Sequence, residues 1–211
     1  MAKRRNRGNS LVNVKIYIEG GGDGKASHSE CRRGYRKLLE KAGFTMRMPQ
    51  AIACGGRSSA FDRFATAIRL PERDVYPVLL VDSESSVSKE PWEHLKGSDG
   101  WDRPDGVEDD QAHLMVQCME TWIVADQEAV RRFFGQNLLA NALPPTVDLE
   151  ERSKDDVQKS LEHATKNCGK GRTYEKGKRS FELLAQLDPQ TLKRLLHHFS
   201  RFCVVLDSKL R

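Results

Sequence analysis

Strand-like and helix-like patterns of hydrophobic positions alternate along the first part of this chain. Residues 12–18 alternate apolar and mixed positions of β-branched and aromatic type before a run of glycines, which predicts a strand that ends in a tight loop. Residues 27–42 carry apolar side chains at helical spacing until Gly43. The same order returns with a predicted strand over 44–53 and a helix over 58–70. This alternation is typical of a parallel α/β sheet.

A nearly continuous apolar run over residues 75–81 predicts a central strand, because a parallel sheet is covered on both faces. Asp82 and Glu84 follow it directly. We therefore expect acidic side chains at the carboxyl end of the most buried strand.

The segment after this strand is expected to be a long loop, followed by further regular structure. Residues 85–110 are rich in Ser, Gly, Pro and acidic residues, and Trp92 and Trp101 are the expected anchors of this loop. A fourth strand is predicted over 112–118 and a helix over 119–134.

The last third of the chain has a helical pattern throughout. Pro144 and Pro145 mark a break, and the expected helices cover residues 149–166, 174–187 and 189–206. We predict three regions: a basic tail over 1–11, an α/β domain over 12–135, and a helical region over 136–211 packed on the same core. A chain of 211 residues is long enough for one such core.

Composition and charge limit the class of protein. The chain has 35 basic and 30 acidic residues, a net charge of +5 that points only mildly to nucleic acid. No stretch approaches the roughly 18 to 20 apolar residues of a membrane span, so no membrane association is expected. The five cysteines are an odd number without a close pair, and a reducing cytoplasm is the expected location.

The acidic residues at two strand ends are the main candidates for chemistry. Glu19 follows the first predicted strand, and Asp82 and Glu84 would share one side if the extended backbone continues to Glu84. Parallel sheets bind ligands beyond their carboxyl ends, where these three carboxylates would meet and hold Mg²⁺ or Mn²⁺. Without a cation they would repel one another. The alternative is that they are solvated loop acids.

A basic segment supplies a candidate partner for a phosphate. Positive charge gathers over residues 166–179, and Lys176 or Lys178 is the expected catalytic-site cation. The alternative is a solvated helix start. Residues 20–25 are glycine-rich, but they lack the spacing of a nucleotide-binding phosphate loop.

Four segments carry a resemblance to a known fold family. Residues 18–23 and 80–84 resemble the two signature segments of Toprim domains, a Glu-Gly and an Asp-x-Asp, with Glu84 in place of the usual second Asp. Residues 116–126 and 171–178 resemble a family of small Toprim-like proteins of unknown function, often encoded beside SMC-like ATPases in bacterial anti-phage loci.

The resemblance implies a function and additional ligands. By analogy with overcoming-lysogenization-defect (OLD) nucleases, it implies an Mg²⁺-dependent nuclease acting on DNA or on RNA such as tRNA, controlled by an SMC-like or OLD-type ATPase in anti-phage defence. Glu19, Asp82 and Glu84 would hold the metal, and Asp23 or Glu120 could hold a second one. The competing hypothesis is a catalytically inactive Toprim-like subunit that binds an ATPase or a nucleic acid.

Overall fold

The computed structural model describes residues 12–169 and 173–210, except for the side chain of Lys178. The predicted basic tail over 1–11 lies outside the described residues. In the described part, a four-stranded parallel sheet has the strand order β2-β1-β3-β4. Its strands are β1 (Asn13–Ile18), β2 (Gln50–Ala53), β3 (Val75–Asp82) and β4 (Ala112–Met115).

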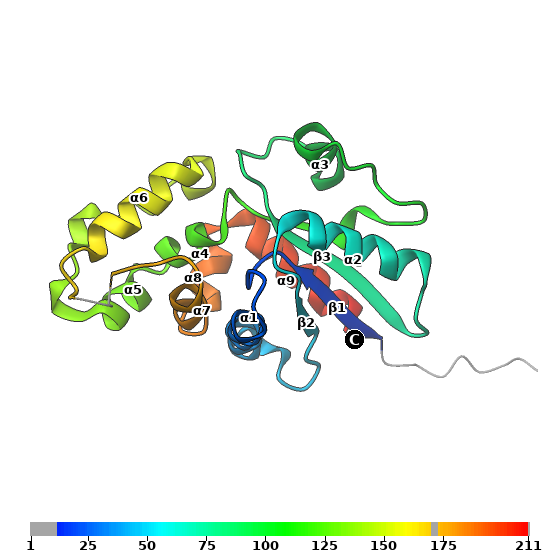
Figure 1. Ribbon diagram of the computed structural model, residues 1–211, viewed down its shortest axis with the longest axis horizontal. Coiled ribbons are helices and arrows are strands. Elements are labelled where there is room, and N and C mark those ends of the chain that lie inside the picture. Colours follow the sequence, from blue (N-terminus) through cyan, green and yellow to red (C-terminus); the bar gives the residue numbers. More distant parts are fainter. Residues whose placement is uncertain (1–11, 170–172, 211) are drawn as a thin grey trace, which may run out of the picture.

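Helices cover the sheet and make up much of the remaining described chain (Figure 1). The α-helices are α1 (Lys25–Leu39), α2 (Arg57–Arg69), α3 (Pro91–Asp99), α4 (Met119–Ala125), α5 (Gln127–Phe134), α6 (Lys154–Thr165), α7 (Lys178–Leu184), α8 (Pro189–Leu195) and α9 (His197–Lys209). Shorter helical turns are η1 (Glu40–Phe44), η2 (Asp109–Gln111), η3 (Gly135–Asn137), η4 (Ala140–Ala142) and η5 (Leu149–Glu151). The predicted fold class, a mainly parallel α/β sheet with a helical C-terminal extension, is therefore correct.

Alternate residues of the strands enter two hydrophobic clusters, one on each face of the sheet. Ile16 and Leu80 pack in the cluster that also contains residues of α1, α4 and the C-terminal helices. Tyr17, Leu79 and Val81 pack in the second cluster with residues of α2 and α3. Burial on both faces explains why β3 is apolar at nearly every position.

The C-terminal helices share the larger cluster with the sheet. Leu183, Leu192 and Phe199 have no exposed surface and belong to the same cluster as Ile16 of β1. Figure 1 shows α5, α6 and α7 beyond the carboxyl-terminal edge of the strands. The helices α6 and α7 of the C-terminal region therefore lie beyond the edge of the sheet at which Glu19 and Asp82 are found (Figure 1).

Two predicted elements differ from the structure near the first half of the sheet. The second strand begins at Gln50 rather than at residue 44, because Phe44 is buried in a π-helical turn that Gly43 closes at a φ of 103°. The segment 85–110 is not a continuous loop, since Pro91 starts the helix α3. Trp101 stacks on Phe61 with ring centroids 4.4 Å apart, so an anchoring tryptophan is confirmed.

Two predicted helices are each divided in the structure. The helix expected over 119–134 becomes α4 and α5, because the Asp126 carboxylate accepts a hydrogen bond from the Ala129 amide and begins a new helix. The helix expected over 189–206 breaks at Leu196, which has an extended backbone between α8 and α9. None of the helices in the described ranges has the length and apolar character needed to cross a membrane.

Replacing Phe199 by Ala should test the contribution of the C-terminal helices to stability. The Phe199 ring is fully buried and meets the Trp122 ring edge-on at 4.8 Å. We expect Phe199→Ala to lower the free energy of unfolding by about 3 to 5 kcal/mol in urea denaturation, because it leaves a cavity. Val204→Ala, at a 66% exposed position of the same helix, is the control and should change it little. Equal small effects of both changes would mean that α9 is not part of the cooperative core.

Candidate metal centre

Glu19 and Asp82 lie at the ends of two adjacent parallel strands. Ile18 of β1 pairs with Leu80 of β3, so the residues that follow emerge side by side at the carboxyl edge. The Glu19 amide donates to the Leu80 carbonyl at 2.9 Å, and the Asp82 amide donates to the Glu19 carboxylate at 3.0 Å. The strand pairing itself therefore brings the two carboxylates together.

Glu84 joins these two carboxylates through a turn rather than through an extended strand. β3 ends at Asp82, and Glu84 has a left-handed backbone with a φ of 64°. The extended backbone up to Glu84, on which the sequence argument for a shared side depended, is thus not present. The Glu84 amide instead donates to the Gln117 carbonyl at 2.9 Å, which holds the turn. A left-handed conformation is costly for a residue with a side chain and occurs often at functional sites.

The three carboxylates form a compact group of oxygen atoms. One oxygen each of Glu19, Asp82 and Glu84 lies within 4.8 Å of the others. Asp82 is only 4% exposed, and Glu84 is the most accessible of the three. Oxygen-only ligands at a partly open position suit a hard divalent cation such as Mg²⁺ or Mn²⁺.

Burial makes ionisation of this group unfavourable in the absence of a cation. Burial raises the pKa of Asp82 well above its usual range, and the neighbouring Glu19 carboxylate raises it further. Burial also raises the pKa of Glu19, although the hydrogen bond from the Asp82 amide opposes this shift. A bound divalent ion would compensate the negative charge, so the donors present fit such an ion.

Arg57, at the start of α2, contacts both Glu19 and Asp82 and was not predicted from the sequence. Its guanidinium forms two hydrogen bonds with the Asp99 carboxylate, at 2.6 and 2.7 Å. It also donates to the Asp82 carbonyl and lies 3.5 Å from a Glu19 oxygen. The Trp101 ring covers the guanidinium, with 5.1 Å between its centroid and Arg57 Cζ. The only feature of the sequence that could have indicated this role is the position of Arg57 directly after the glycines that follow β2.

Lys154 is a second basic residue that the sequence did not reveal. Its ammonium lies 2.6 and 2.7 Å from the two Glu84 carboxylate oxygens and 3.8 Å from Asp82 Oδ2. Lys154 is the first residue of α6, far along the chain from Glu84. No local motif marks it, because its role arises only when α6 packs beside the sheet edge.

Glycines shape the approach to the acidic group. Gly20 and Gly55 exchange backbone hydrogen bonds of 2.8 and 3.0 Å between the loops that follow β1 and β2. A side chain at Gly55 would place its Cβ 2.7 Å from the Gly22 carbonyl oxygen, and the φ of Gly55 is 78°. The two loops therefore need glycine to meet this closely.

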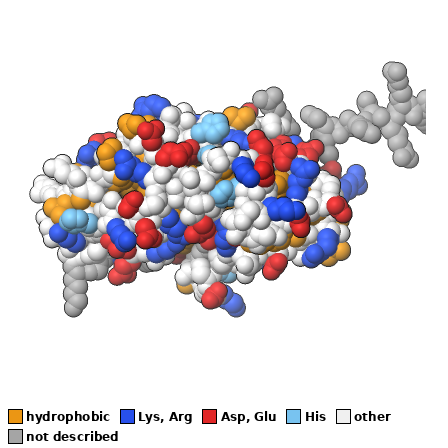
Figure 2. Space-filling view, turned by 90° about the horizontal axis from the view of Figure 1, so that it is seen from above, with side chains coloured by type: hydrophobic (Ala, Val, Ile, Leu, Met, Phe, Trp, Pro, Cys, Tyr) orange, Lys and Arg blue, Asp and Glu red, His pale blue; other side chains and the backbone are white. Residues whose placement is uncertain are grey.

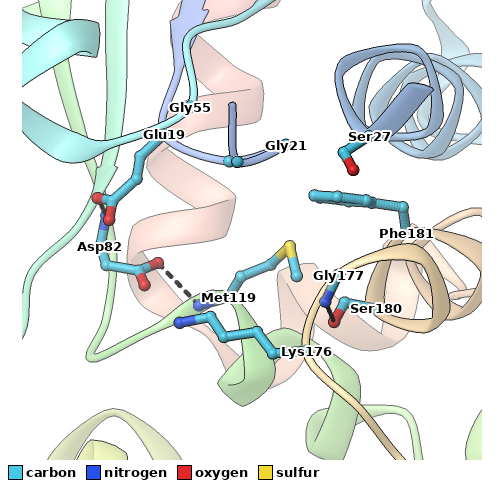
Figure 3. Close-up of a pocket in the computed structure, with 12 residues that line it drawn as sticks. Glu19, Gly21, Ser27, Gly55, Asp82, Met119, Lys176, Gly177, Ser180 and Phe181 are labelled. Atoms are coloured by element: carbon cyan, nitrogen blue, oxygen red, sulfur yellow. Dashed lines mark hydrogen bonds between the residues drawn. The ribbon is translucent and has the colours of Figure 1, made fainter. Parts of the chain in front are cut away.

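A cavity of about 480 Å³ lies beside Glu19 and Asp82. Figure 3 shows it between the glycine loop, α1 and the start of α7, with the Lys176 side chain pointing toward Asp82. The lining residues are Glu19, Gly20, Gly21, Gly22, Ser27, Gly55, Asp82, Met119, Lys176, Gly177, Ser180 and Phe181. The predicted cation Lys176 is thus in the cavity, whereas the side chain of Lys178 is outside the described part of the structure.

The structure does not bring Asp23 and Glu120, the expected ligands of a second cation, into the three-carboxylate group. Asp23 is exposed in the glycine loop. Glu120 is fully buried, and its carboxylate accepts hydrogen bonds from the Tyr174 hydroxyl at 2.7 Å and the Gln158 amide at 3.3 Å. These bonds give Glu120 a structural role in joining α4, α6 and the segment before α7. Ligation of a second metal by either residue stays a prediction.

Comparison with known proteins agrees with the fold and supplies a family. A family model described as a domain of unknown function (DUF4276) matches residues 18–207. The chain belongs to this family. Among solved structures, it is similar to the C-terminal region of the Burkholderia pseudomallei OLD protein, with a TM-score of 0.51 and 13% identity over 95% of this chain and 100% of that one. This likeness confirms the Toprim-like fold. A comparison of this DUF4276 chain with curated proteins finds no match.

Replacing Asp82 by Asn should stabilise the metal-free protein at alkaline pH. The pKa of Asp82 is higher in the folded protein than in the unfolded chain, so Asp82 ionises more easily when the chain unfolds. The free energy of unfolding therefore falls as the pH rises. We expect Asp82→Asn to raise the free energy of unfolding at pH 8 by about 1 to 2 kcal/mol, with no gain below pH 4.

The measurement is urea denaturation with a chelator at both pH values. Asn can still accept the hydrogen bond that the Met119 amide donates at 2.9 Å. Asp105→Asn, at an exposed position, is the control for the loss of one charge. A loss of stability at pH 8 in Asp82→Asn would contradict the prediction.

Replacing Arg57 by Lys should weaken the scaffold of the site although the charge is retained. A lysine cannot form the two parallel bonds to Asp99 and also reach the Asp82 carbonyl. We expect a loss of about 1 to 3 kcal/mol in the free energy of unfolding, measured by urea denaturation. Arg69→Lys on the same helix is the matched control and should have a much smaller effect. Equal effects would show that the Arg57 network contributes little.

Proposed function

We propose that the chain is a Mg²⁺- or Mn²⁺-dependent nuclease that hydrolyses phosphodiester bonds of DNA or RNA. The observation that carries this proposal is the convergence of Glu19, Asp82 and Glu84 within 4.8 Å at the carboxyl edge of a parallel sheet. The similarity in fold to the C-terminal region of an OLD protein supports it.

In this proposal the carboxylates of the site bind the metal, and a lysine binds the phosphate. Glu19, Asp82 and Glu84 would hold the cation, which when bound would neutralise charge on the phosphate and favour deprotonation of the attacking water. Lys176 lies across the cavity from Glu19 and is placed to contact a phosphate oxygen, where its charge balances the negative charge of the transition state. Lys178 is the second candidate for this role. Asp23 or Glu120 is proposed for a second metal only if the site rearranges.

The cavity and the surface are compatible with a polynucleotide substrate. About 480 Å³ beside the carboxylates leaves space for a phosphodiester and part of a nucleotide. Figure 2 shows basic and acidic side chains interspersed over the face that it presents, not a single basic stripe. Such a surface favours local contacts near the site over a long electrostatic track.

Control by an SMC-like or OLD-type ATPase, a role in anti-phage defence and a cytoplasmic location belong to the same proposal. They rest on the resemblance of residues 116–126 and 171–178 to small Toprim-like proteins encoded near such ATPases. A partner ATPase would then decide when the nuclease acts.

The second candidate is a catalytically inactive subunit that binds an ATPase or a nucleic acid. The observation that favours it is Glu84, which stands in place of the usual Asp and has both carboxylate oxygens bonded to Lys154. In this case the acidic group would be structural.

Cleavage assays separate the two candidates. Purified protein is incubated with labelled plasmid DNA and total tRNA, with Mg²⁺ or Mn²⁺, with and without the SMC-like or OLD-type ATPase proposed as its partner. We expect metal-dependent cleavage that falls at least about a thousandfold in a Glu19→Ala/Asp82→Ala variant, because the charge of the reacting phosphate is no longer neutralised. Asp105→Asn serves as the folded, active control. Absence of cleavage when metal and partner both bind would favour the inactive subunit.

A further inference from the structure

We propose that Lys154 is the resident cation of the metal-free site and that a divalent ion must displace it from Glu84. The proposal rests on the metal-dependent function above and concerns what sets the affinity for the metal. Lys154 is 2.6 and 2.7 Å from the two Glu84 oxygens and 3.8 Å from Asp82 Oδ2. An ammonium group therefore bridges two of the three carboxylates.

The Lys154 ammonium occupies the position between the two Glu84 oxygens that a cation bound to both of them would take. Both oxygens of Glu84 accept hydrogen bonds from the same ammonium. A cation such as Mg²⁺ needs its oxygen ligands at about 2.1 Å and tolerates little distortion of its octahedral geometry. An ammonium and a divalent ion cannot share this position, so ligation there requires the bonds between Glu84 and Lys154 to break.

Of the two basic residues that form ion pairs with the three carboxylates in the described part of the structure, Lys154 is the one that can be displaced. Arg57 has a 14% exposed side chain and is held by two bonds to Asp99. Lys154 has a 23% exposed side chain, and its closest partner Glu84 is 41% exposed. A lysine has a flexible four-carbon stem, whereas the planar arginine fork is fixed by its bidentate partner.

The backbone that carries Lys154 is rigid even though its side chain can move. Ser153 begins α6, and its hydroxyl accepts a hydrogen bond from the Asp156 amide at 3.1 Å. Val157 and Leu161 of this helix are fully buried in the main hydrophobic cluster. Displacement therefore involves the lysine side chain alone and leaves α6 in place.

Charge gives the direction of the effect on affinity. The Lys154 ammonium lies beside two of the three carboxylates, so its charge partly replaces the charge of a metal. The same charge repels an incoming divalent ion, and its bonds to Glu84 must be lost on metal binding. Removing the ammonium should then tighten metal binding and destabilise the metal-free protein.

The test is the affinity for Mn²⁺ of Lys154→Met, measured by isothermal titration calorimetry at pH 8.5, where protonation of the carboxylates competes least. We expect a Kd about tenfold lower than that of the unchanged protein, equivalent to about 1.4 kcal/mol. Lys159→Met is the matched control, because Lys159 lies on the same helix with a 73% exposed side chain and should leave the Kd unchanged. An unchanged or higher Kd in Lys154→Met overturns the proposal.

A double-mutant cycle measures the ion pair between Lys154 and Glu84 with and without the metal. Lys154→Met and Glu84→Gln are combined, and the free energy of unfolding is measured with a chelator and with saturating Mn²⁺. We expect a favourable coupling between Lys154 and Glu84 that disappears when Mn²⁺ is bound. Coupling that persists at saturating Mn²⁺ would show that the lysine is not displaced.

The outcomes separate this proposal from the proposed function. If the unchanged protein binds Mn²⁺ and Lys154→Met binds it no more tightly, only the role of Lys154 fails. If the unchanged protein binds neither Mn²⁺ nor Mg²⁺ while the coupling is present, the metal-dependent function fails and Lys154 is a permanent structural partner of Glu84.

Discussion

The carboxylate of Asp82 stands at the end of a buried strand, next to a second carboxylate, and most of the site is arranged around this unfavourable charge. Parallel pairing of β1 and β3 forces Glu19 and Asp82 together. Burial raises the pKa of both groups, so the folded protein must compensate their negative charge or protonate them. A divalent ion is the partner that such an arrangement suits, and the surrounding residues keep the carboxylates in place for it.

Arg57 and Lys154 compensate the negative charge of the carboxylates in different ways. Arg57 links the segment containing α3 to the sheet edge, since it bonds Asp99, the Asp82 carbonyl and Glu19 together. Lys154 approaches from α6 and pairs with the more exposed Glu84. The first is part of the scaffold and the second is exchangeable. This difference follows from side-chain chemistry, because a bidentate guanidinium is held in one orientation and an ammonium is not.

The fold and the chemistry of the site support the proposed function to different degrees. Membership in the DUF4276 family identifies relatives without giving an activity. Similarity to the C-terminal region of an OLD protein at 13% identity shows a shared fold, which by itself hosts many functions. The carboxylate group and the adjoining cavity with Lys176 are properties of this chain, and they carry the nuclease proposal.

Local sequence patterns determined the strands and the acidic residues at their ends. An apolar strand such as β3 is visible in the sequence, and so are Asp82 at its end and Glu19 directly after β1. Tertiary structure alone decided the backbone of Glu84, which depends on a bond to the Gln117 carbonyl, and the burial of Glu120 against Tyr174. It also decided the pairing of Lys154 with Glu84. These features arise from contacts between segments far apart in the sequence, so the spacing of residues along the chain could not predict them.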